Sequence, residues 1–321
     1  MAGLDNQVPQ VLVLAGTTAS GKTDVSIPLA LSLNAEIINA DSRQVYRDLK
    51  IGSAPPSEDQ LAAVPHYFVA TKSLTERWTA GDFAREARSI LSRRAAASQC
   101  TVVVGGSMLY LQALLDGLYD NENEPEIDYA ALRTEWDARG PEAMMQELEQ
   151  LDPEIAAQTN KADYHRTLRA IGHFRATGQR LSEMRQKACE PLPQVFRLYF
   201  LYGDRAVTYE RVNRRAELML EQGLVEEVRH LLSQGFDETN TNALRTHGYQ
   251  EVFPYLRGEC EFETMRDEIQ KAVRHYVKRQ LTWFRRDTRA IWAERSFAER
   301  PEDIAQRIRH DFIEVESLKE K

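Results

Sequence analysis

The chain has 321 residues, of which 42% are hydrophobic and 28% charged, so it can bury the core of one large or two modest domains. It has no apolar run of about eighteen residues and no basic, apolar leader, which argues against a membrane span or secretory signal and favours the cytoplasm. The net charge of −8 argues against an indiscriminate nucleic-acid binder, and the three widely spaced cysteines argue against a disulfide framework.

The first predicted strand, Gln10 to Ala15, runs directly into a glycine-rich loop. Residues 16–23 match the phosphate-binding pattern G-x-x-x-x-G-K-[ST], and a helix is expected from Lys22 to Leu33. In such a loop backbone N–H groups converge on phosphate oxygens, the lysine adds positive charge, and the final hydroxyl, here Thr23, can ligate Mg²⁺. The segment predicts binding of a diphosphate-bearing substrate; the alternative is a glycine-rich turn without a ligand.

The second predicted strand, Glu36 to Ala40, ends at the polar segment Asp41–Tyr46. In a parallel sheet this segment lies at the carboxyl edge, beside the phosphate loop, where an acceptor substrate would bind. The carboxylate of Asp41 could serve there as a general base, or it could cap a helix with no catalytic task. The residues themselves leave both roles open.

A helix at 83–97, a strand at 101–104 and a helix at 107–115 continue the alternation and predict a parallel α/β sheet. The strand runs into Gly105-Gly106-Ser107 instead of the acidic residue that holds Mg²⁺ in most ATPases and kinases. The sequence also lacks the Asn-Lys-x-Asp stretch of GTPases. These absences weaken a nucleotide-hydrolysing function without excluding it.

The composition changes near residue 120. Residues 119–125 are acidic and loop-like, the stretch that follows to about Cys189 has only helical patterns, and Val195 to Tyr202 is again apolar and β-prone. We therefore expect a P-loop α/β core in residues 1–120, an all-helical insertion domain in 121–190 and the completion of the core in 191–321. Helices are predicted at 206–221, 224–232 and 265–284, followed by a short strand at 290–292 and a tail helix.

Basic and aromatic residues are interleaved at the end of the long predicted helix. Seven lysines and arginines stand between Lys271 and Arg289, opposed only by Asp287, together with three aromatic residues. This arrangement suits a phosphate backbone with unstacked bases. The alternative is a solvated helix face with Trp283 and Phe284 in the core.

Together these segments resemble the tRNA dimethylallyltransferases, also called tRNA isopentenyltransferases, over nearly the whole chain. Beyond the phosphate loop and Asp41–Tyr46, the matching blocks are Ile51–Ala54, Pro65-His66, Ala80–Phe83, Gly105–Tyr110, Arg166–Ala170, Thr177-Gly178, Arg211, Arg215, Met219, Gly248–Glu251 and Lys278–Arg285. The resemblance, to the bacterial type, implies a P-loop NTPase-like parallel sheet core flanked by helices. It also implies transfer of a dimethylallyl group from dimethylallyl diphosphate to N6 of adenine 37, beside the anticodon of tRNA, with release of pyrophosphate. No phosphoryl group would move, which accounts for the missing strand-end acid.

The resemblance also implies roles for individual residues. Asp41 would take the N6 proton, Ser107, Lys22 and Arg215 would complete the catalytic set, and Thr23 would hold the cofactor Mg²⁺. The amine becomes strongly acidic as it is alkylated, so late proton transfer to a carboxylate is downhill. Charge builds on the departing pyrophosphate, so electrostatic stabilisation should dominate. The diphosphate would be bound by Gly16, Thr18, Ala19, Ser20, Gly21, Lys22, Thr23, Arg211 and Arg215.

Contacts with tRNA are implied on the core, on the insertion and on the basic helix. They comprise Asp41, Ser42, Arg43, Gln44, Ser107, His165, Arg166, Thr167, Leu168, Arg169, Arg245, Gly248, Tyr249, Lys278, Arg279, Gln280 and Arg285. For Tyr249, Trp283 and Phe284 individually, core packing is the expected role. The target base must leave its stack to reach such a site. A monomeric enzyme is expected, without a membrane partner.

Five positions depart from the family's usual residues: Thr17 stands for Pro, Ser107 for Thr, Asp128 for a tRNA-contacting Arg, Gly172 for Glu and Val273 for Thr. The charge reversal at Asp128 puts that one RNA contact in doubt. Three other functions stay open. The first is an adenylate isopentenyltransferase acting on free AMP, ADP or ATP, although a mononucleotide hardly needs the insertion or the basic segment. The others are a P-loop ATPase or small-molecule kinase, and a non-catalytic RNA-binding protein.

Overall fold

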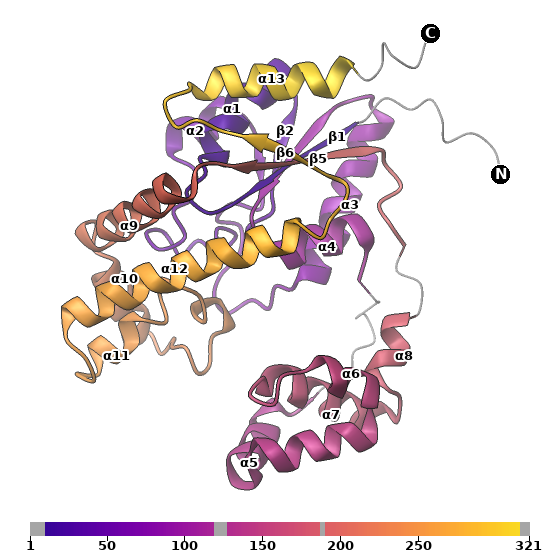
Figure 1. The fold of residues 1–321 in the computed structure, drawn as a ribbon, viewed down its shortest axis with the longest axis vertical. Coiled ribbons are helices and arrows are strands. Elements are labelled where there is room, and N and C mark those ends of the chain that lie inside the picture. Colours follow the sequence, from indigo (N-terminus) through magenta and orange to yellow (C-terminus); the bar gives the residue numbers. More distant parts are fainter. Residues whose placement is uncertain (1–9, 119–126, 187–189, 315–321) are drawn as a thin grey trace, which may run out of the picture. The chain divides into compact units, whose positions relative to one another are not determined.

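A computed structural model of the protein describes residues 10–118, 127–186 and 190–314 (Figure 1). They belong to two compact units: unit 1 comprises Met1–Leu114 and Pro193–Lys321, and unit 2 comprises Leu115–Leu192. The helical insertion expected at 121–190 falls within the bounds of unit 2. The acidic segment at 119–125 and Cys189 lie outside the described residues.

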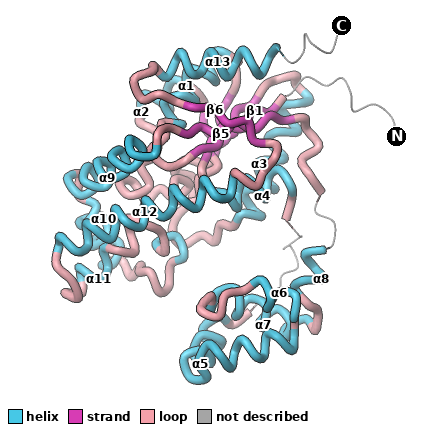
Figure 2. Tube along the Cα trace, in the orientation of Figure 1, coloured by secondary structure: helices cyan, strands magenta, loops and turns pink. Residues whose placement is uncertain are grey.

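Unit 1 is built on a six-stranded parallel sheet with the strand order β3-β2-β4-β1-β5-β6. Figure 2 shows the strands of this sheet in magenta. The strands are β1 (Val11–Gly16), β2 (Glu36–Asn39), β3 (His66–Tyr67), β4 (Thr101–Gly105), β5 (Phe196–Tyr202) and β6 (Ala290–Glu294). In β1, Leu12 lies opposite Val102 of β4 on one side and Arg197 of β5 on the other. Apolar and β-branched residues dominate the inner strands because both faces of a parallel sheet are covered.

Helices cover both faces of this sheet. On one face, α1 (Lys22–Ser32) and α13 (Pro301–Glu314) share a core in which Leu12, Leu29 and Ile308 are buried (Figure 1). On the other face lies α12 (Phe262–Phe284), whose Phe284 ring is 4.6 Å from that of Phe200 in β5. This layering confirms the predicted α/β fold class with a sheet flanked by helices.

Seven further helices belong to unit 1 within the described residues. They are α2 (Glu58–Ala63), α3 (Ala80–Ala96), α4 (Met108–Asp116), α9 (Arg205–Glu221), α10 (Leu224–Ser233), η1 (Asn242–Leu244) and α11 (Val252–Leu256). The sequence analysis missed α2, β3, η1 and α11, all of which are short. A local signal for α2 exists, since Ser57 and Gln60 form a reciprocal capping box at its start.

Unit 2 contains α5 (Tyr129–Leu151), α6 (Pro153–Gln158), α7 (Tyr164–Thr177) and α8 (Leu181–Gln186), with Trp136, Leu148 and Ile171 in its core. Asp128 caps α5, because its Oδ1 accepts the N–H of Ala131 at 2.9 Å. In the part of the chain that the structure describes, no helix has the length and apolar character needed to cross a membrane.

Gly172 lies at a close contact between segments of unit 2. A Cβ atom added there would lie 2.6 Å from Cγ2 of Ile127 and 2.8 Å from Cδ1 of Leu132. A longer side chain would therefore force these two neighbours apart. The glycine at this position thus has a packing reason in this chain.

Candidate active site

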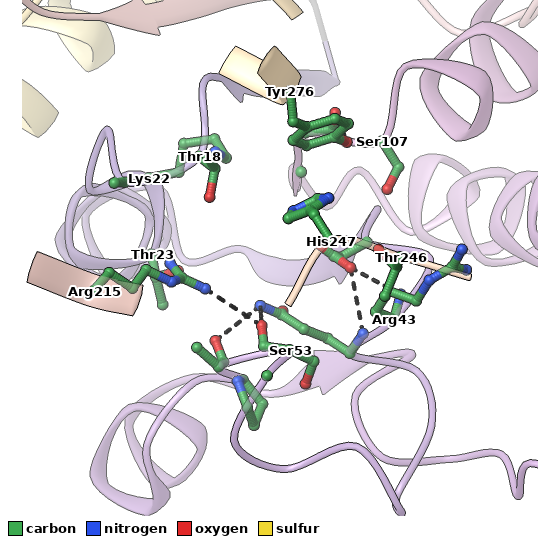
Figure 3. Close-up of a pocket in the computed structure, with 18 of the residues that line it drawn as sticks. Thr18, Lys22, Thr23, Arg43, Ser53, Ser107, Arg215, Thr246, His247 and Tyr276 are labelled. Carbon is green, nitrogen blue, oxygen red and sulfur yellow. Dashed lines mark hydrogen bonds between the residues drawn. The ribbon is translucent and has the colours of Figure 1, made fainter. Parts of the chain in front are cut away.

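A cavity of about 880 Å³ opens in unit 1 at the carboxyl ends of β1, β2 and β4. Its walls come from the phosphate loop, the segments that follow β2 and β4, α9, α12 and residues 245–250. Figure 3 shows Lys22, Thr23 and Arg215 at one side of the cavity and Arg43, Ser107 and His247 at the other. Parallel α/β sheets bind their ligands at this edge.

The phosphate loop has the backbone geometry that anion binding requires. The N–H of Ser20 donates to Thr17 O at 3.2 Å, and Ala19 and Gly21 have positive φ angles of 59° and 79°. The first amides of α1, which begins at Lys22, have no carbonyl partner within the helix. The buried hydroxyls of Thr17 and Ser20 contact no hydrogen-bond partner among the described residues. The loop therefore retains donors for phosphate oxygens.

The Lys22 ammonium lies inside this loop. Its Nζ donates to the carbonyl oxygens of Gly16 at 3.0 Å and Thr17 at 2.6 Å. Burial lowers the pKa of Lys22 to about 8, although the carboxylate of Asp41 favours the charged form. A bound anion would favour that form further, so Lys22 is suited to hold a phosphate group.

Most residues predicted to bind the diphosphate meet at the cavity. Two of them, Gly16 and Ser20, form the buried loop backbone and do not line it. At Gly16 a Cβ would lie 2.4 Å from Leu201 O, which explains the need for glycine. The residues that do line the cavity are Thr18, Ala19, Gly21, Lys22, Thr23, Arg211 and Arg215.

Two arginines of α9 project toward the same side. They are four residues apart and therefore share one helix face. Arg211 Nε donates to Ala19 O at 3.0 Å, and Arg215 Nη2 donates to Ser53 O at 3.5 Å (Figure 3). Burial lowers the pKa of Arg215, with Asp41 acting in the opposite direction. Within the described ranges no carboxylate forms an ion pair with Arg215, so its charge is available to an anion in the cavity.

Asp41 divides its two carboxylate oxygens between two environments. Oδ1 accepts the N–H of Arg43 at 2.8 Å and that of Gln44 at 3.3 Å, so the residue caps the turn after β2. Among the described residues, no donor contacts Oδ2, and Asp41 lines the cavity. The capping role is therefore present, and one oxygen is still free to accept a proton.

The segment after β4 contacts the segment after β2. Ser107 Oγ accepts the N–H of Ser42 at 3.0 Å and donates to Ser42 Oγ at 3.3 Å. Gln44 Nε2 donates to the carbonyl oxygens of Ser53 at 3.2 Å and Ala54 at 3.0 Å. The structure thus brings together the predicted Asp41–Gln44 and Ser107.

Gln280, predicted to contact tRNA, is 1% exposed and joins two loops. Its Oε1 accepts the N–H of Thr18 at 2.9 Å, and its Nε2 donates to Gly106 O at 2.9 Å. Both ends of the amide are thus bonded to backbone. In this structure Gln280 holds the phosphate loop against the segment after β4.

Tyr249, also predicted to contact tRNA, is fully buried beneath another wall of the cavity. Its hydroxyl donates to Glu227 Oε1 at 2.6 Å, and Glu227 Oε2 accepts the N–H groups of Lys50 at 3.0 Å and Ile51 at 2.9 Å. A Cβ at Gly52 would lie 2.3 Å from the Tyr249 ring. Tyr249 therefore supports the loop that includes Ser53, as its expected core role implies.

The side of the cavity opposite the phosphate loop contains His247 and Tyr276. The sequence analysis placed them only within an RNA-facing segment and within the basic, aromatic segment, without assigning either a role in the site. His247 stacks on Tyr276, with ring centroids 4.5 Å apart, and the Arg279 guanidinium lies 5.5 Å from the Tyr276 centroid. Burial and the nearby charges of Arg43, Arg279 and Arg215 lower the pKa of His247 to about 3. The imidazole is therefore neutral at pH 7.

The segment that contains His247 also includes two predicted tRNA contacts. Arg245 lines the cavity and donates from Nε to Glu238 O at 2.6 Å. Gly248 does not line the cavity; its φ of 95° makes the turn, and its N–H donates to Glu251 Oε2 at 2.7 Å. The role of Gly248 in this structure is conformational.

The basic helix α12 exposes most of its predicted RNA contacts. Lys278 and Arg279 are exposed on the helix, and Arg285 is exposed directly after it. The expectation that Trp283 packs in the core is wrong, because this side chain is 39% exposed, whereas Phe284 is buried as expected. Helical periodicity explains the difference, since only one of two adjacent residues can point squarely at the core.

The predicted tRNA contacts of unit 2 lie at the start of α7. His165 and Arg166 are exposed there, and Arg169 is half-buried. Thr167 and Leu168 are buried, and Leu168 belongs to the core of the unit. Their side chains therefore contribute to packing within the unit.

The proposed metal ligand Thr23 stands in the first turn of α1 and lines the cavity. The described residues contain no group of three or more His, Cys, Asp or Glu side chains that could hold a metal ion. Mg²⁺ usually keeps several waters and is shared between one or two protein oxygens and substrate phosphates. A single hydroxyl beside the phosphate loop fits such a site.

The sequence of this chain is similar to the sequences of known proteins. A family model described as IPP transferase matches residues 44–287. The chain belongs to the IPP transferase family. The match begins at Gln44, three residues after Asp41, and includes both arginines of α9 and the whole of α12. The resemblance that the sequence analysis identified is thereby confirmed.

Several IPP transferase relatives match nearly end to end. A tRNA dimethylallyltransferase from Alkaliphilus oremlandii (strain OhILAs) is 35% identical over 309 residues, which cover 94% of this chain and 97% of that protein. Another from Thermotoga neapolitana is 36% identical and covers 91% of this chain and 95% of its own. The crystal structure of the full-length tRNA isopentenylpyrophosphate transferase from Bacillus halodurans aligns with a TM-score of 0.70 and 29% identity, covering 98% of this chain and 100% of that one.

Proposed function

We propose that this IPP transferase transfers a dimethylallyl group from dimethylallyl diphosphate to N6 of adenine 37 in tRNA. The N6–C1 bond forms while the C1–O bond to the diphosphate breaks, pyrophosphate leaves, and one N6 proton passes to the protein. One observation carries the proposal: a single cavity holds the cationic phosphate loop on one side and the free carboxylate oxygen of Asp41 on the other. Relatives named tRNA dimethylallyltransferase, 35% and 36% identical over most of the chain, support it.

The donor diphosphate would bind to the phosphate loop. Lys22 and Arg215 place two cations where negative charge develops on the leaving group, and the loop amides donate to the same oxygens. Such fixed donors stabilise a transition state more than a ground state when they match the developing charge. Mg²⁺ held by Thr23 and the phosphates would neutralise further charge on the pyrophosphate.

The acceptor adenine would enter beside Asp41. Oδ1 is held by backbone amides, so the carboxylate is oriented, and Oδ2 is available to accept the N6 proton. The hydroxyl of Ser107 would exchange its hydrogen bond to Ser42 Oγ for one to the bridging oxygen or to the base. Asp41 acts late, as the alkylated amine becomes acidic.

The RNA would contact the exposed cations of α12 and the exposed residues at the start of α7. Lys278, Arg279 and Arg285 provide positive charge for phosphates on a protein whose net charge is −8. The aromatic ring of Trp283, 39% exposed, lies among them in sequence. The enzyme is proposed to act in the cytoplasm as a monomer.

Mass spectrometry tests the proposal directly. An unmodified anticodon stem-loop with adenine at the target position is incubated with the protein, dimethylallyl diphosphate and Mg²⁺. We expect a gain of one dimethylallyl group on that adenine and an equivalent amount of pyrophosphate. A stem-loop with guanine at the target position is the matched control and should stay unmodified.

Parallel incubations separate the rival functions. Efficient prenylation of AMP in place of the stem-loop would instead indicate an adenylate isopentenyltransferase. Substantial ATP turnover without a prenyl donor would indicate an ATPase or kinase. Stem-loop binding without any prenyl transfer would indicate a non-catalytic RNA-binding protein, and each of these outcomes would overturn the proposal.

A further inference from the structure

We propose that Arg295 is a positioning residue for the phosphate loop: it sets the direction of the Gly21 amide and places a positive charge behind the loop. Arg295 directly follows β6 and is only 6% exposed. Its backbone N–H donates to Tyr202 O at 2.8 Å, and its Nη1 donates to Ser20 O at 2.8 Å. The side chain thus connects the edge strand to the phosphate loop. The inference rests on the proposed function only in taking a diphosphate as the ligand of this loop.

The hydrogen bond to Ser20 O determines where the next amide points. In a trans peptide unit the C=O and the N–H point in opposite directions. Arg295 does not line the cavity, so it holds the Ser20 carbonyl toward the outside of the loop. The N–H of Gly21 belongs to the same peptide unit and therefore points the other way. Gly21 lines the cavity, so this amide is presented to a bound diphosphate.

The guanidinium of Arg295 packs directly against Gly21. A Cβ atom at residue 21 would lie 1.5 Å from Nη1 of Arg295. The φ of Gly21 is +79°, a conformation that L side chains rarely adopt. Glycine is thus required twice at this position: by the backbone turn and by the arginine behind it.

A second arginine bonds to the preceding carbonyl of the loop. Arg211 Nε donates to Ala19 O at 3.0 Å, and Arg295 donates to the next carbonyl, that of Ser20. Both guanidinium groups pack on the ring of Phe297, at 4.4 Å and 5.3 Å from its centroid. Two consecutive carbonyls are therefore held by two cations that share one aromatic ring. The pair fixes the backbone of this part of the loop before a ligand arrives.

Among the residues that the structure describes, Arg295 forms no ion pair with a carboxylate. Its Nε is buried without a hydrogen-bond partner among the same residues. Burial and the neighbouring charge of Arg211 lower the pKa of Arg295, and the more distant Asp24 and Glu299 only partly oppose this shift. A buried cation without a partner is costly. An anion held in the loop would offset that cost, so donor binding and the charge of Arg295 support each other.

Calorimetric titration with inorganic pyrophosphate and Mg²⁺ tests this role. We expect Arg295→Met to weaken pyrophosphate binding at least tenfold, because both the hydrogen bond and the charge are lost. Arg295→Lys keeps the charge but lacks the planar guanidinium, so we expect its affinity for pyrophosphate to fall three- to tenfold. Arg300→Met is the matched control: this side chain is 73% exposed, pairs with Asp303 in the same region, and its loss should change the affinity less than twofold.

Steady-state kinetics distinguish positioning from general damage. In the Arg295 variants the KM for dimethylallyl diphosphate should rise, while the KM for the stem-loop stays within twofold of wild type. A folded Arg295 variant that binds pyrophosphate within twofold of wild type would overturn the proposal, as would an equal loss in Arg300→Met. Where Arg295→Met does not fold, the Arg295→Lys titration decides. The titration needs neither RNA nor prenyl transfer, so its failure is distinct from failure of the proposed function.

Discussion

The two sides of the cavity are constructed differently. The donor side centres on one contiguous loop of backbone groups, to which Lys22 and the two arginines of α9 add charge. Distant side chains such as Gln280 and Arg295 hold the loop's carbonyls and amides in place. The acceptor side is assembled from side chains of separate segments, among them Asp41, His247 and Tyr276. A rigid backbone cradle suits a diphosphate, which every donor shares. Side chains from several segments suit a base, whose edge and ring must be recognised.

The largest effect is expected from Arg215→Ala, which removes a cation from the donor side. A contact present in both ground and transition states should lower kcat/KM for the donor by about 10³-fold and weaken pyrophosphate binding by about tenfold. Single-turnover transfer and calorimetry measure the two effects. Arg229→Ala serves as the control, because Arg229 is an exposed residue of α10 that pairs with Glu226. Unaltered kinetics would remove Arg215 from the site.

The acceptor side should respond to Asp41→Asn with only a small change on the donor side, where the Asp41 carboxylate favours the charged forms of Lys22 and Arg215. The amide oxygen of Asn can still accept the N–H groups of Arg43 and Gln44, so the turn is retained while the base is lost. Turnover should fall by about 10²-fold, with pyrophosphate affinity within twofold of wild type. Asp59→Asn, exposed on α2, is the control. A matching loss of pyrophosphate affinity would show that the two sides are not independent.

The affinity for dimethylallyl diphosphate should decline at alkaline pH because of Lys22. Its pKa is lowered to about 8, so above this pH the free enzyme loses the charge that the diphosphate requires. Without RNA, the Kd should rise roughly tenfold per pH unit above 8. In Lys22→Arg the guanidinium keeps its proton throughout this range, so the Kd should be independent of pH whatever its value. A flat profile for wild type would contradict the position of Lys22 in the donor site.

The smallest effect is expected from Lys278→Ala, which replaces an exposed residue of α12. Loss of one phosphate contact should raise the KM for the stem-loop by about threefold and reduce the slope of log K against log salt by about one. The donor KM should not change. Arg266→Ala is the control on the same helix, since that arginine precedes the basic segment and pairs with Asp267. An unchanged salt slope would exclude Lys278 as an RNA contact.

The parts of the site that follow a strand directly could be predicted from the sequence. The phosphate loop and Asp41 each come after a buried apolar strand, and strand ends of a parallel sheet meet at one edge. The supporting contacts could not be predicted. Arg295 bonds to a residue 275 positions earlier, and no local pattern indicates that pairing.

The sequence also did not distinguish every RNA contact from a residue that packs in the core. Gln280 has the chemistry of an RNA-binding side chain, but helix phase buries it, whereas for Tyr249 the expected core role is confirmed. Tyr276 belongs to the interleaved basic and aromatic segment that the sequence analysis identified, and it stands four positions before Gln280, so the two residues share one helix face. His247 had no comparable signal, since its surroundings come from α12 and the segment after β2.

Gln280 joins the long helix α12 to the phosphate loop by a hydrogen bond. In the same helix Lys278 and Arg279 are exposed to solvent. The next residue, Gln280, accepts a hydrogen bond from the backbone N–H of Thr18. If RNA binds the exposed cations of α12 as proposed, any displacement of the helix would reach the phosphate loop through the Gln280 amide. Under the proposed function, RNA binding and the order of the donor site would then depend on the same helix.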